Sequence, residues 1–263
     1  EERAPMDAAI LDPQKMWDVL RRASSIAGIQ AWVGVDAPPD GMAARTDVGY
    51  HRTNNEDAHV VLSYHPAGPP FPTTVMVLAD GVGGEDCGEI ASNVAVKTVA
   101  ADLFCKILAP DPADPDVSDI LNSITLANDG ILSEKLRRNM PTDMATTLVV
   151  AVLSGRTLHI ANVGDSRAYL LDKEVIRQIT EDHTLMTELI RMNRIDPEKA
   201  RTHHMRHIIT RVMGKEKTVE PASQTLTVSP DDVILLCSDG LTDMLEDAEI
   251  ERLRATMAGE RAE

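Results

Sequence analysis

The stretch Leu148-Val-Val-Ala-Val-Leu-Ser-Gly-Arg-Thr-Leu-His-Ile-Ala-Asn-Val163 decides the fold class. Its two apolar, β-branched runs are separated by Ser154-Gly155-Arg156, a short turn that is typical of an antiparallel hairpin. Further short runs bounded by Gly, Asp or Pro predict other strands. With the two hairpin strands, the predicted set is 73–80, 145–153, 157–163, 167–171, 175–179 and 233–238.

Helical patterns lie in two long blocks, at 88–108 and 117–138, with a Pro- and Asp-rich loop at 109–116 between them. A doubly wound parallel sheet would need a helix after nearly every strand. Because the helices come in blocks instead, the sequence predicts an α+β fold built on antiparallel sheet.

Length and composition narrow the class of protein. The 263 residues are 43% hydrophobic, enough for one large domain or one domain with an appendage. The net charge is −16, with 42 acidic against 26 basic residues. Such a surface repels phosphate backbones and anionic lipids, so we expect no nucleic-acid and no membrane partner. The sequence has neither an 18-residue apolar stretch nor a basic segment leading into an apolar block, which argues against membrane spanning and export.

The three cysteines, Cys87, Cys105 and Cys237, are too few for a disulfide framework. We interpret them as reduced, mostly buried thiols of a cytoplasmic protein. Residues 1–43 differ from the rest, with a possible amphipathic helix at 13–27 and a Pro- and Gly-containing break at 36–41. The sequence therefore predicts a partly helical N-terminal extension and linker at 1–43, followed by one domain at 44–263.

Four short acidic segments, centred on Glu56-Asp57, Asp80, Asp165 and Asp239, are the candidates for chemistry. Asp80 follows an apolar run directly, Asp239 follows one after the single residue Ser238, and both precede a glycine, so each is expected at the mouth of a buried strand. Carboxylate and carbonyl oxygens are the ligands that Mg²⁺ and Mn²⁺ prefer. One Asp-Gly after a strand is usually only a turn. The combination indicates a site for a pair of metal ions.

Six motifs, in this order, resemble the metal-dependent protein serine/threonine phosphatases of the type 2C (PPM) family, bacterial branch. They are Thr46-Asp47-Val48-Gly49 with Arg52-Thr53-Asn54-Asn55-Glu56-Asp57-Ala58, Ala79-Asp80-Gly81-Val82-Gly83-Gly84 with Gly88-Glu89-Ile90-Ala91-Ser92, Met144-Ala145-Thr146-Thr147-Leu148, Asn162-Val163-Gly164-Asp165-Ser166-Arg167-Ala168-Tyr169, Thr180-Glu181-Asp182-His183, and Leu235-Leu236-Cys237-Ser238-Asp239-Gly240-Leu241-Thr242-Asp243. The resemblance implies a four-layer α-β-β-α sandwich, with two stacked antiparallel sheets flanked by helices and the metals at one end.

The implied activity is hydrolysis of phosphoserine and phosphothreonine in proteins by a hydroxide that bridges two Mn²⁺ or Mg²⁺ ions. The implied partners are phosphorylated proteins, including a serine/threonine kinase and its substrates, and the implied state is a monomer. One alternative is a catalytically weakened or inactive module that binds and regulates a phosphorylated partner. Another is a nucleotidase, which the 3% aromatic content disfavours because little stacking surface is available.

Five residues form the expected metal centre. Asp80 is expected to bridge both ions, with the carbonyl of Gly81 beside it, because glycine lets the backbone approach an ion closely. Glu56 is expected to serve the second ion with Asp80 and Gly81, and Asp239 the first ion with Asp80. Asp57 is expected to orient metal-bound water rather than touch an ion.

Arg52 matches the family's phosphate-holding arginine, and its guanidinium can grip two phosphate oxygens at once. We therefore place it with Asp80 among the catalytic residues. The alternative is an ion pair with Glu56 or Asp57, four and five residues further along the chain.

Other polar residues are given structural roles. Asp165-Ser166-Arg167 is expected to form a turn with a salt bridge, and His183 to act as a cap or hydrogen-bonding residue. His203 and His207 have the spacing of one helical turn, which can bind Zn²⁺. We nevertheless expect them, with His204, to form polar surface.

Two departures from the family pattern affect the expected site. Ala145 replaces the glycine that the family usually has at this position, so the backbone geometry of this loop could differ from that of the family. The sequence has no Asp-Asn pair after Asp239, so it lacks the family's C-terminal Asp-Asn segment and last strand. The ion at Asp239 is therefore expected to bind more weakly than its partner, unless another carboxylate, such as Asp243, takes the vacant position.

Overall fold

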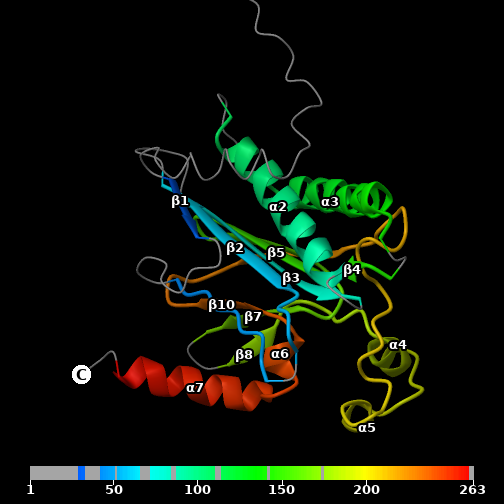
Figure 1. Ribbon diagram of the computed structural model, residues 1–263. Helices are drawn as coiled ribbons and strands as arrows, with labels where there is room; N and C mark the ends of the chain where they lie inside the picture. The colour runs from blue at the N-terminus through cyan, green and yellow to red at the C-terminus, as the bar shows by residue number, and fades with distance from the viewer. Residues whose placement is uncertain are drawn as a thin grey trace, which may run out of the picture.

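The computed structural model describes residues 29–32, 42–50, 52–65, 72–83, 87–109, 114–140, 143–172 and 175–260. Within them the chain forms two antiparallel sheets with helices on their outer sides (Figure 1), as the α+β prediction requires. The helix predicted at 13–27 and the break at 36–41 lie outside the described residues.

The larger sheet has the order β1-β2-β3-β5-β6-β9, and β4 pairs with the end of β3. Its strands are β1 (Ile29–Trp32), β2 (Asp57–Tyr64), β3 (Thr73–Val82), β4 (Ala145–Thr146), β5 (Leu148–Ser154), β6 (Thr157–Val163) and β9 (Ala222–Thr227). The predicted hairpin is confirmed, since β5 and β6 pair from Leu148 opposite Val163 to Ser154 opposite Thr157.

The smaller sheet has the order β10-β7-β8 and consists of β10 (Val233–Cys237), β7 (Arg167–Leu171) and β8 (Ile176–Gln178). One apolar cluster fills the space between the two sheets. It joins buried residues of β5 and β6, such as Val149 and Ile160, to Ala168 and Leu170 of β7. Burial of this shared face is what holds the smaller sheet against the larger one.

The long helices α2 (Cys87–Ile107) and α3 (Val117–Arg138) cover the other face of the larger sheet (Figure 1). Both were predicted within one residue at each end. Asp116 caps α3 in a reciprocal capping box with Asp119, and Asn139 ends the helix in the left-handed conformation (φ 52°). Beyond the smaller sheet lies α7 (Asp247–Glu260) (Figure 1).

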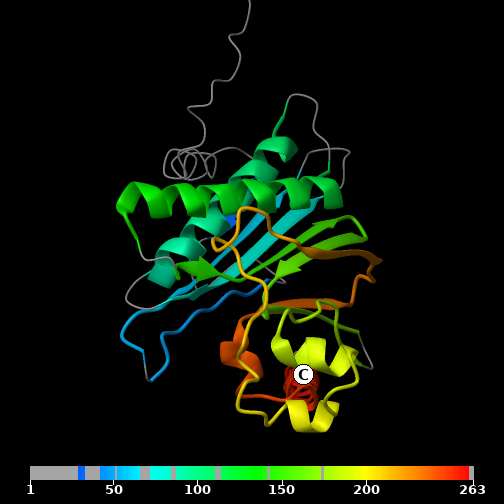
Figure 2. The ribbon, with the colours of Figure 1, turned by 90° about the vertical axis from the view of Figure 1, so that its right-hand side faces the viewer.

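Two short helices, α4 (Leu185–Arg191) and α5 (Pro197–Ala200), lie outside the two sheets, at the same end of the molecule as the one-turn helix α6 (Asp239–Thr242) (Figure 2). We call residues 184–214, which contain α4 and α5, the flap. The flap returns to the larger sheet through a backbone bridge between Met213 and Thr146.

Several elements were not predicted, namely β1, β2, β9 and the four helices α4 to α7. The strand β1 falls within the predicted extension at 1–43 and pairs with β2 along Val61 to Tyr64. The boundary at residue 43 stays a prediction. None of the helices in the described part of the chain is long and apolar enough to cross a membrane.

Candidate metal centre

The ends of β2 and β3 bring two of the predicted acidic segments together. Asp57 lies opposite Asp80 in the antiparallel ladder. One residue further, the backbone N–H of Gly81 donates to the carbonyl of Glu56 at 3.1 Å. The register of one strand pair therefore places Glu56, Asp57, Asp80 and Gly81 at a single edge of the larger sheet.

The backbone of Asp80 is fixed by two buried threonines. Its carbonyl accepts from the N–H of Thr147 and from the hydroxyl of Thr146, both at 2.9 Å. Its own N–H donates to Oγ1 of Thr147 at 3.0 Å, and that hydroxyl lies 2.7 Å from the hydroxyl of Ser166. Because all these groups are buried, the position of Asp80 is held by hydrogen bonds that water cannot easily replace.

Asp165 and Asp239 reach the same edge from other elements. Asp165 follows β6 in a turn where Gly164 has φ +100°, and a Cβ at Gly164 would lie 2.7 Å from Cβ of Thr147. Asp239 begins α6 one residue after the end of β10, and the hydroxyl of the residue between them, Ser238, donates to Asp57 at 2.9 Å. This last bond ties the smaller sheet to the end of β2.

The four carboxylates of Asp57, Asp80, Asp165 and Asp239, which we call the carboxylate cluster, repel one another. Asp80 is only 8% exposed. Burial, followed by repulsion from Asp57 and Asp239, raises its pKa to about 9. Burial also raises the pKa of Asp57, and burial with the charge of Asp239 raises the pKa of Asp165 to about 6.

Such crowding is unfavourable for the protein alone and favourable for a divalent cation, which supplies the missing positive charge to an all-oxygen donor set. The residues present thus fit a site for hard divalent ions.

Glu56 and Gly81 meet at a close approach between β3 and the start of α2. A Cβ added to Gly88 would lie 2.8 Å from Oε1 of Glu56 and 2.8 Å from the carbonyl carbon of Gly81. Glycine at this point lets α2 dock directly on the strand end. The Glu56 carboxylate and the Gly81 carbonyl group are therefore next to each other, as two ligands of one ion have to be.

Arg52 makes the ion pair that the sequence left open as the alternative. Its Nη1 lies 2.9 Å from Oε2 of Glu56, and the arginine side chain is 61% exposed against 14% for the glutamate. The Arg52 guanidinium therefore stands beside the site with most of its side chain exposed to solvent.

The predicted structural residues divide into two kinds. Arg167 pairs with Asp182 through Nη2 and Oδ2 at 2.6 Å, and His183 accepts at Nδ1 from the N–H of Gly164 at 3.1 Å, so both act as expected. Asp165 was expected to serve only the turn, yet it lies in the carboxylate cluster. The sequence could have indicated this role of Asp165, because it is a third Asp near the end of a predicted strand. It differs from Asp80 and Asp239 in that its glycine, Gly164, comes before it instead of after it.

The histidines of the flap do not pair as their spacing allowed. His203 stacks on His204, with ring centroids 4.4 Å apart, whereas His207 lies near Asp239 and Asp243. Of the cysteines, Cys87 and Cys237 are buried as expected, but Cys105 is exposed. Ala145 causes no distortion, since it pairs with Val82 in regular register and is buried.

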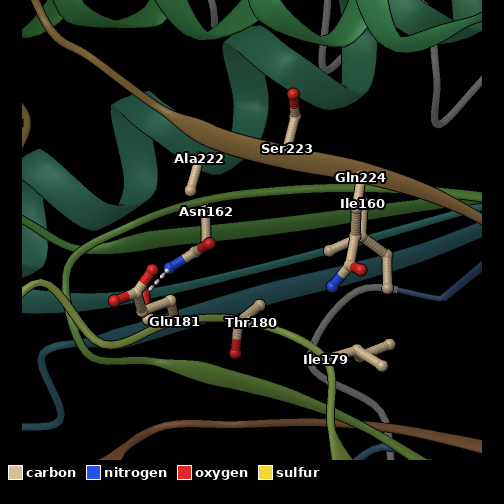
Figure 3. Close-up of a pocket in the computed structure, with 8 residues that line it drawn as sticks. All are labelled: Ile160, Asn162, Ile179, Thr180, Glu181, Ala222, Ser223 and Gln224. Atoms are coloured by element: carbon tan, nitrogen blue, oxygen red, sulfur yellow. Dashed lines mark hydrogen bonds between the residues drawn. The ribbon is translucent and has the colours of Figure 1, made fainter.

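A separate pocket of about 290 Å³ lies between β6, β9 and residues 179–181 (Figure 3). Its lining is mixed, with Asn162 donating from Nδ2 to the carbonyl of Glu181 at 2.9 Å. None of the four clustered carboxylates lines it. The carboxylate cluster thus lies at an edge where strands end, distinct from this pocket.

Comparison with known proteins agrees with this geometry. The protein phosphatase 2C family profile matches residues 51–260. The serine/threonine phosphatase stp of Listeria innocua is 37% identical over 209 residues, covering 80% of this chain and 81% of that protein.

Two solved structures share the fold. The crystal structure of the serine/threonine phosphatase Stp1 from Staphylococcus aureus aligns with a TM-score of 0.70 and 33% identity over 86% of this chain and 81% of that one. The catalytic domain of the serine/threonine protein phosphatase PstP, crystallised in complex with two manganese ions, aligns with a TM-score of 0.66 and 28% identity over 86% and 84%. The chain belongs to the protein phosphatase 2C (PPM) family of metal-dependent serine/threonine phosphatases, among its bacterial members.

Proposed function

We propose that this chain hydrolyses phosphoserine and phosphothreonine in proteins at the carboxylate cluster, using two Mn²⁺ or Mg²⁺ ions. The observation that carries the proposal is the crowding of one buried and three half-buried carboxylates at one sheet edge, an arrangement that divalent cations would stabilise. Family membership supports the reaction class.

Four residues would hold the ions. Asp80 would contribute to both sites, Glu56 and the Gly81 carbonyl to one of them, and Asp239 to the other. When bound, the ions neutralise the phosphoryl oxygens and lower the pKa of water. The hydrogen bonds that the Asp80 backbone makes with Thr146 and Thr147 would keep Asp80 in place as the charges at the site change.

The remaining groups would act on the substrate and on water. Arg52 would exchange its ion pair with Glu56 for the phosphate, gripping two oxygens with its planar guanidinium. Asp57, held by the hydroxyl of Ser238, would accept a hydrogen bond from the attacking water and set its direction. Asp165 would add negative charge beside Asp239 and favour cations at that end of the cluster.

The four-layer arrangement and the phosphoprotein partners expected from the sequence are part of this proposal. The outer positions of α2 with α3, and of α7, support the four-layer α-β-β-α arrangement. The proposed partners are phosphorylated proteins, among them a serine/threonine kinase and its substrates. The cytoplasmic location, the monomeric state and weaker binding of the ion at Asp239 stay predictions.

The test is hydrolysis of a phosphothreonine peptide by the full chain, stripped of metal and then supplied with Mn²⁺. We expect phosphate release only after Mn²⁺ is added, with no release in excess chelator. A matched peptide carrying phosphotyrosine is the control and should be hydrolysed much more slowly. Undiminished hydrolysis in chelator would contradict the proposal.

A further inference from the structure

The flap brings a histidine to the far side of Asp239. Asp239 and Asp243 are four residues apart on and just after α6, so they lie on the same face of one helical turn. His207 of the flap faces this turn, with Nδ1 3.6 Å from Oδ2 of Asp243. One ligand atom from each of the three residues lies within 4.8 Å of the other two.

These three donors are chemically matched to a transition-metal ion. Ligand atoms around one such ion lie about 3–4 Å apart, so only a small movement of exposed side chains would close the site. Imidazole nitrogen with two carboxylate oxygens favours Mn²⁺ or Zn²⁺ over Mg²⁺, which strongly prefers oxygen. The donors come from two segments more than thirty residues apart, so an ion here would join the flap to α6.

A cationic side chain lies against two of these three residues. Arg206 places Nη2 3.8 Å from Oδ1 of Asp243, and its Nε donates to Nε2 of His207 at 2.9 Å. Because Nε2 accepts this bond, the proton of the neutral ring sits on Nδ1, which faces Asp243. An ion bound at Nδ1 would shift that proton to Nε2 and break the bond with Arg206. The hydrogen bond from Arg206 and a metal ion at Nδ1 of His207 would therefore compete with each other.

Other links between this part of the flap and the α6–α7 region are weak. Arg201 pairs with Glu246 at 3.3 Å, but these side chains are 65% and 67% exposed. Exposed pairs of this kind contribute little because solvent screens them. A metal ion held by three side chains would be a much stronger connection.

We propose that His207, Asp239 and Asp243 bind a divalent transition-metal ion that fastens the flap beside the carboxylate cluster. This ion goes beyond the proposed hydrolysis, which uses neither His207 nor Asp243. It would share Asp239 with the catalytic centre, since the two oxygens of one carboxylate can serve two ions. Metal supply would then control the position of the flap as well as the chemistry.

The test is pulsed electron paramagnetic resonance of Mn²⁺ bound to the full, untagged chain, which detects nitrogen directly bound to manganese. The carboxylate cluster offers only oxygen, so a nitrogen coupling reports the proposed site. We expect the coupling in the unchanged protein and its loss in His207→Ala and in Asp243→Asn. His204→Ala, an exposed histidine three residues away, is the matched control and should keep it.

Arg206→Gln sharpens the test, because it removes the competing guanidinium. The Mn²⁺ concentration that half-saturates the nitrogen-coupled site should fall about two- to fivefold, the size of one exposed ion pair. Equal melting temperatures of all variants in chelator would show that each one folds.

The outcomes separate this inference from the proposed function. Mn²⁺ bound without any nitrogen coupling, or a coupling that survives in His207→Ala, would overturn the inference even if the peptide is hydrolysed. A coupling that is lost in His207→Ala would support it even if hydrolysis is absent.

Discussion

The carboxylate cluster and the flap lie side by side but are held in opposite ways. At the cluster, the backbone of Asp80 makes three hydrogen bonds to two fully buried threonines, and its side chain lies among like charges. In the flap, residues 201–208 are exposed or half-exposed, and Arg206 and His207 meet α6 through contacts longer than 3.5 Å. The cluster is rigid and electrostatically unfavourable, whereas the flap is electrostatically paired and weakly attached.

This difference indicates how the two regions divide the work. A fixed arrangement of ligands removes the cost of reorganising the site during the reaction. Repulsion among the carboxylates of the cluster favours cation binding, because a bound cation would offset that repulsion. Residues 201–208 of the flap are held by few strong contacts, so a change in their position would cost little free energy.

The largest effect is expected for Asp80→Asn. Turnover should fall by at least about a thousandfold, or about 4 kcal/mol, because both ions would be weakened together. Near pH 7 the metal-free variant should melt at a higher temperature than the unchanged protein. Folding of the unchanged protein must either hold the Asp80 charge among like charges or bind a proton there, and asparagine requires neither.

Steady-state kinetics and calorimetry would measure both properties of Asp80→Asn. Asp129→Asn, exposed on α3, is the matched control and should change neither. A lower melting temperature for metal-free Asp80→Asn would show that the cluster is not under electrostatic strain.

Arg52→Ala should raise KM more than it lowers kcat, because Arg52 would hold the phosphate in both ground and transition states. The expected loss is about 1.5–3 kcal/mol, the range for charge-assisted hydrogen bonds. Arg52→Lys keeps the positive charge but cannot hold two phosphate oxygens at once. Its KM should therefore lie between that of the unchanged protein and that of Arg52→Ala. If KM is unchanged while Mn²⁺ binds differently, Arg52 serves only as the partner of Glu56.

Gly81→Ala tests the rigidity of the cluster. The new Cβ would lie 2.3 Å from the carbonyl carbon and oxygen of Gly88, so β3 and α2 would have to separate. We expect the free energy of unfolding to fall by about 1–3 kcal/mol, as in other overpacked cores, and activity to fall with it. Gly130→Ala is the control, because its Cβ would meet Val94 at an ordinary 3.4 Å. Equal stability of the two variants in denaturant titrations would contradict the tight docking.

The smallest effect concerns His183, where the flap leaves the core. Burial and then the charge of Arg211 lower the pKa of His183 below its ordinary 6.5. The unfolded chain therefore binds this proton more readily, so stability is full above about pH 6.5 and falls as the pH drops below it. His183→Asn keeps an acceptor for the Gly164 N–H but cannot titrate.

Between pH 7.5 and 5.5 the unchanged protein should lose about 1 kcal/mol more stability than His183→Asn, roughly one hydrogen bond. Denaturant titrations at the two pH values would measure the difference. Parallel losses would mean that His183 does not link flap stability to pH.

The sequence predicted the parts of the fold whose patterns are strong. Both long helices and the strands of the β5–β6 hairpin have periodic apolar residues that end at clear breaks. β2 was missed because only three of its eight residues, Val60, Leu62 and the polar Ser63, are wholly buried, and its first residues belong to the acidic site. β9 was missed because it is an edge strand whose alternate residues are exposed. It is held to β6 by backbone hydrogen bonds, which leave no apolar pattern in the sequence.

The candidate site divides in the same way. Motifs identified Glu56, Asp80, Gly81 and Asp239, and the structure brings them to one region. Asp165 was assigned to a turn, because only the tertiary structure shows that this turn lies against Thr147. The approach of His207 to Asp243 depends on the path of the flap, and spacing within a sequence cannot encode it.

The most direct test of the central claim is a crystal of the full chain soaked in Mn²⁺, with anomalous diffraction recorded at the manganese edge. We predict one peak between Glu56, the Gly81 carbonyl and Asp80, and a second between Asp80 and Asp239. Peaks that avoid Asp80, or no peak at the carboxylate cluster in saturating Mn²⁺, would contradict the assignment of this sheet edge as a two-metal phosphatase centre.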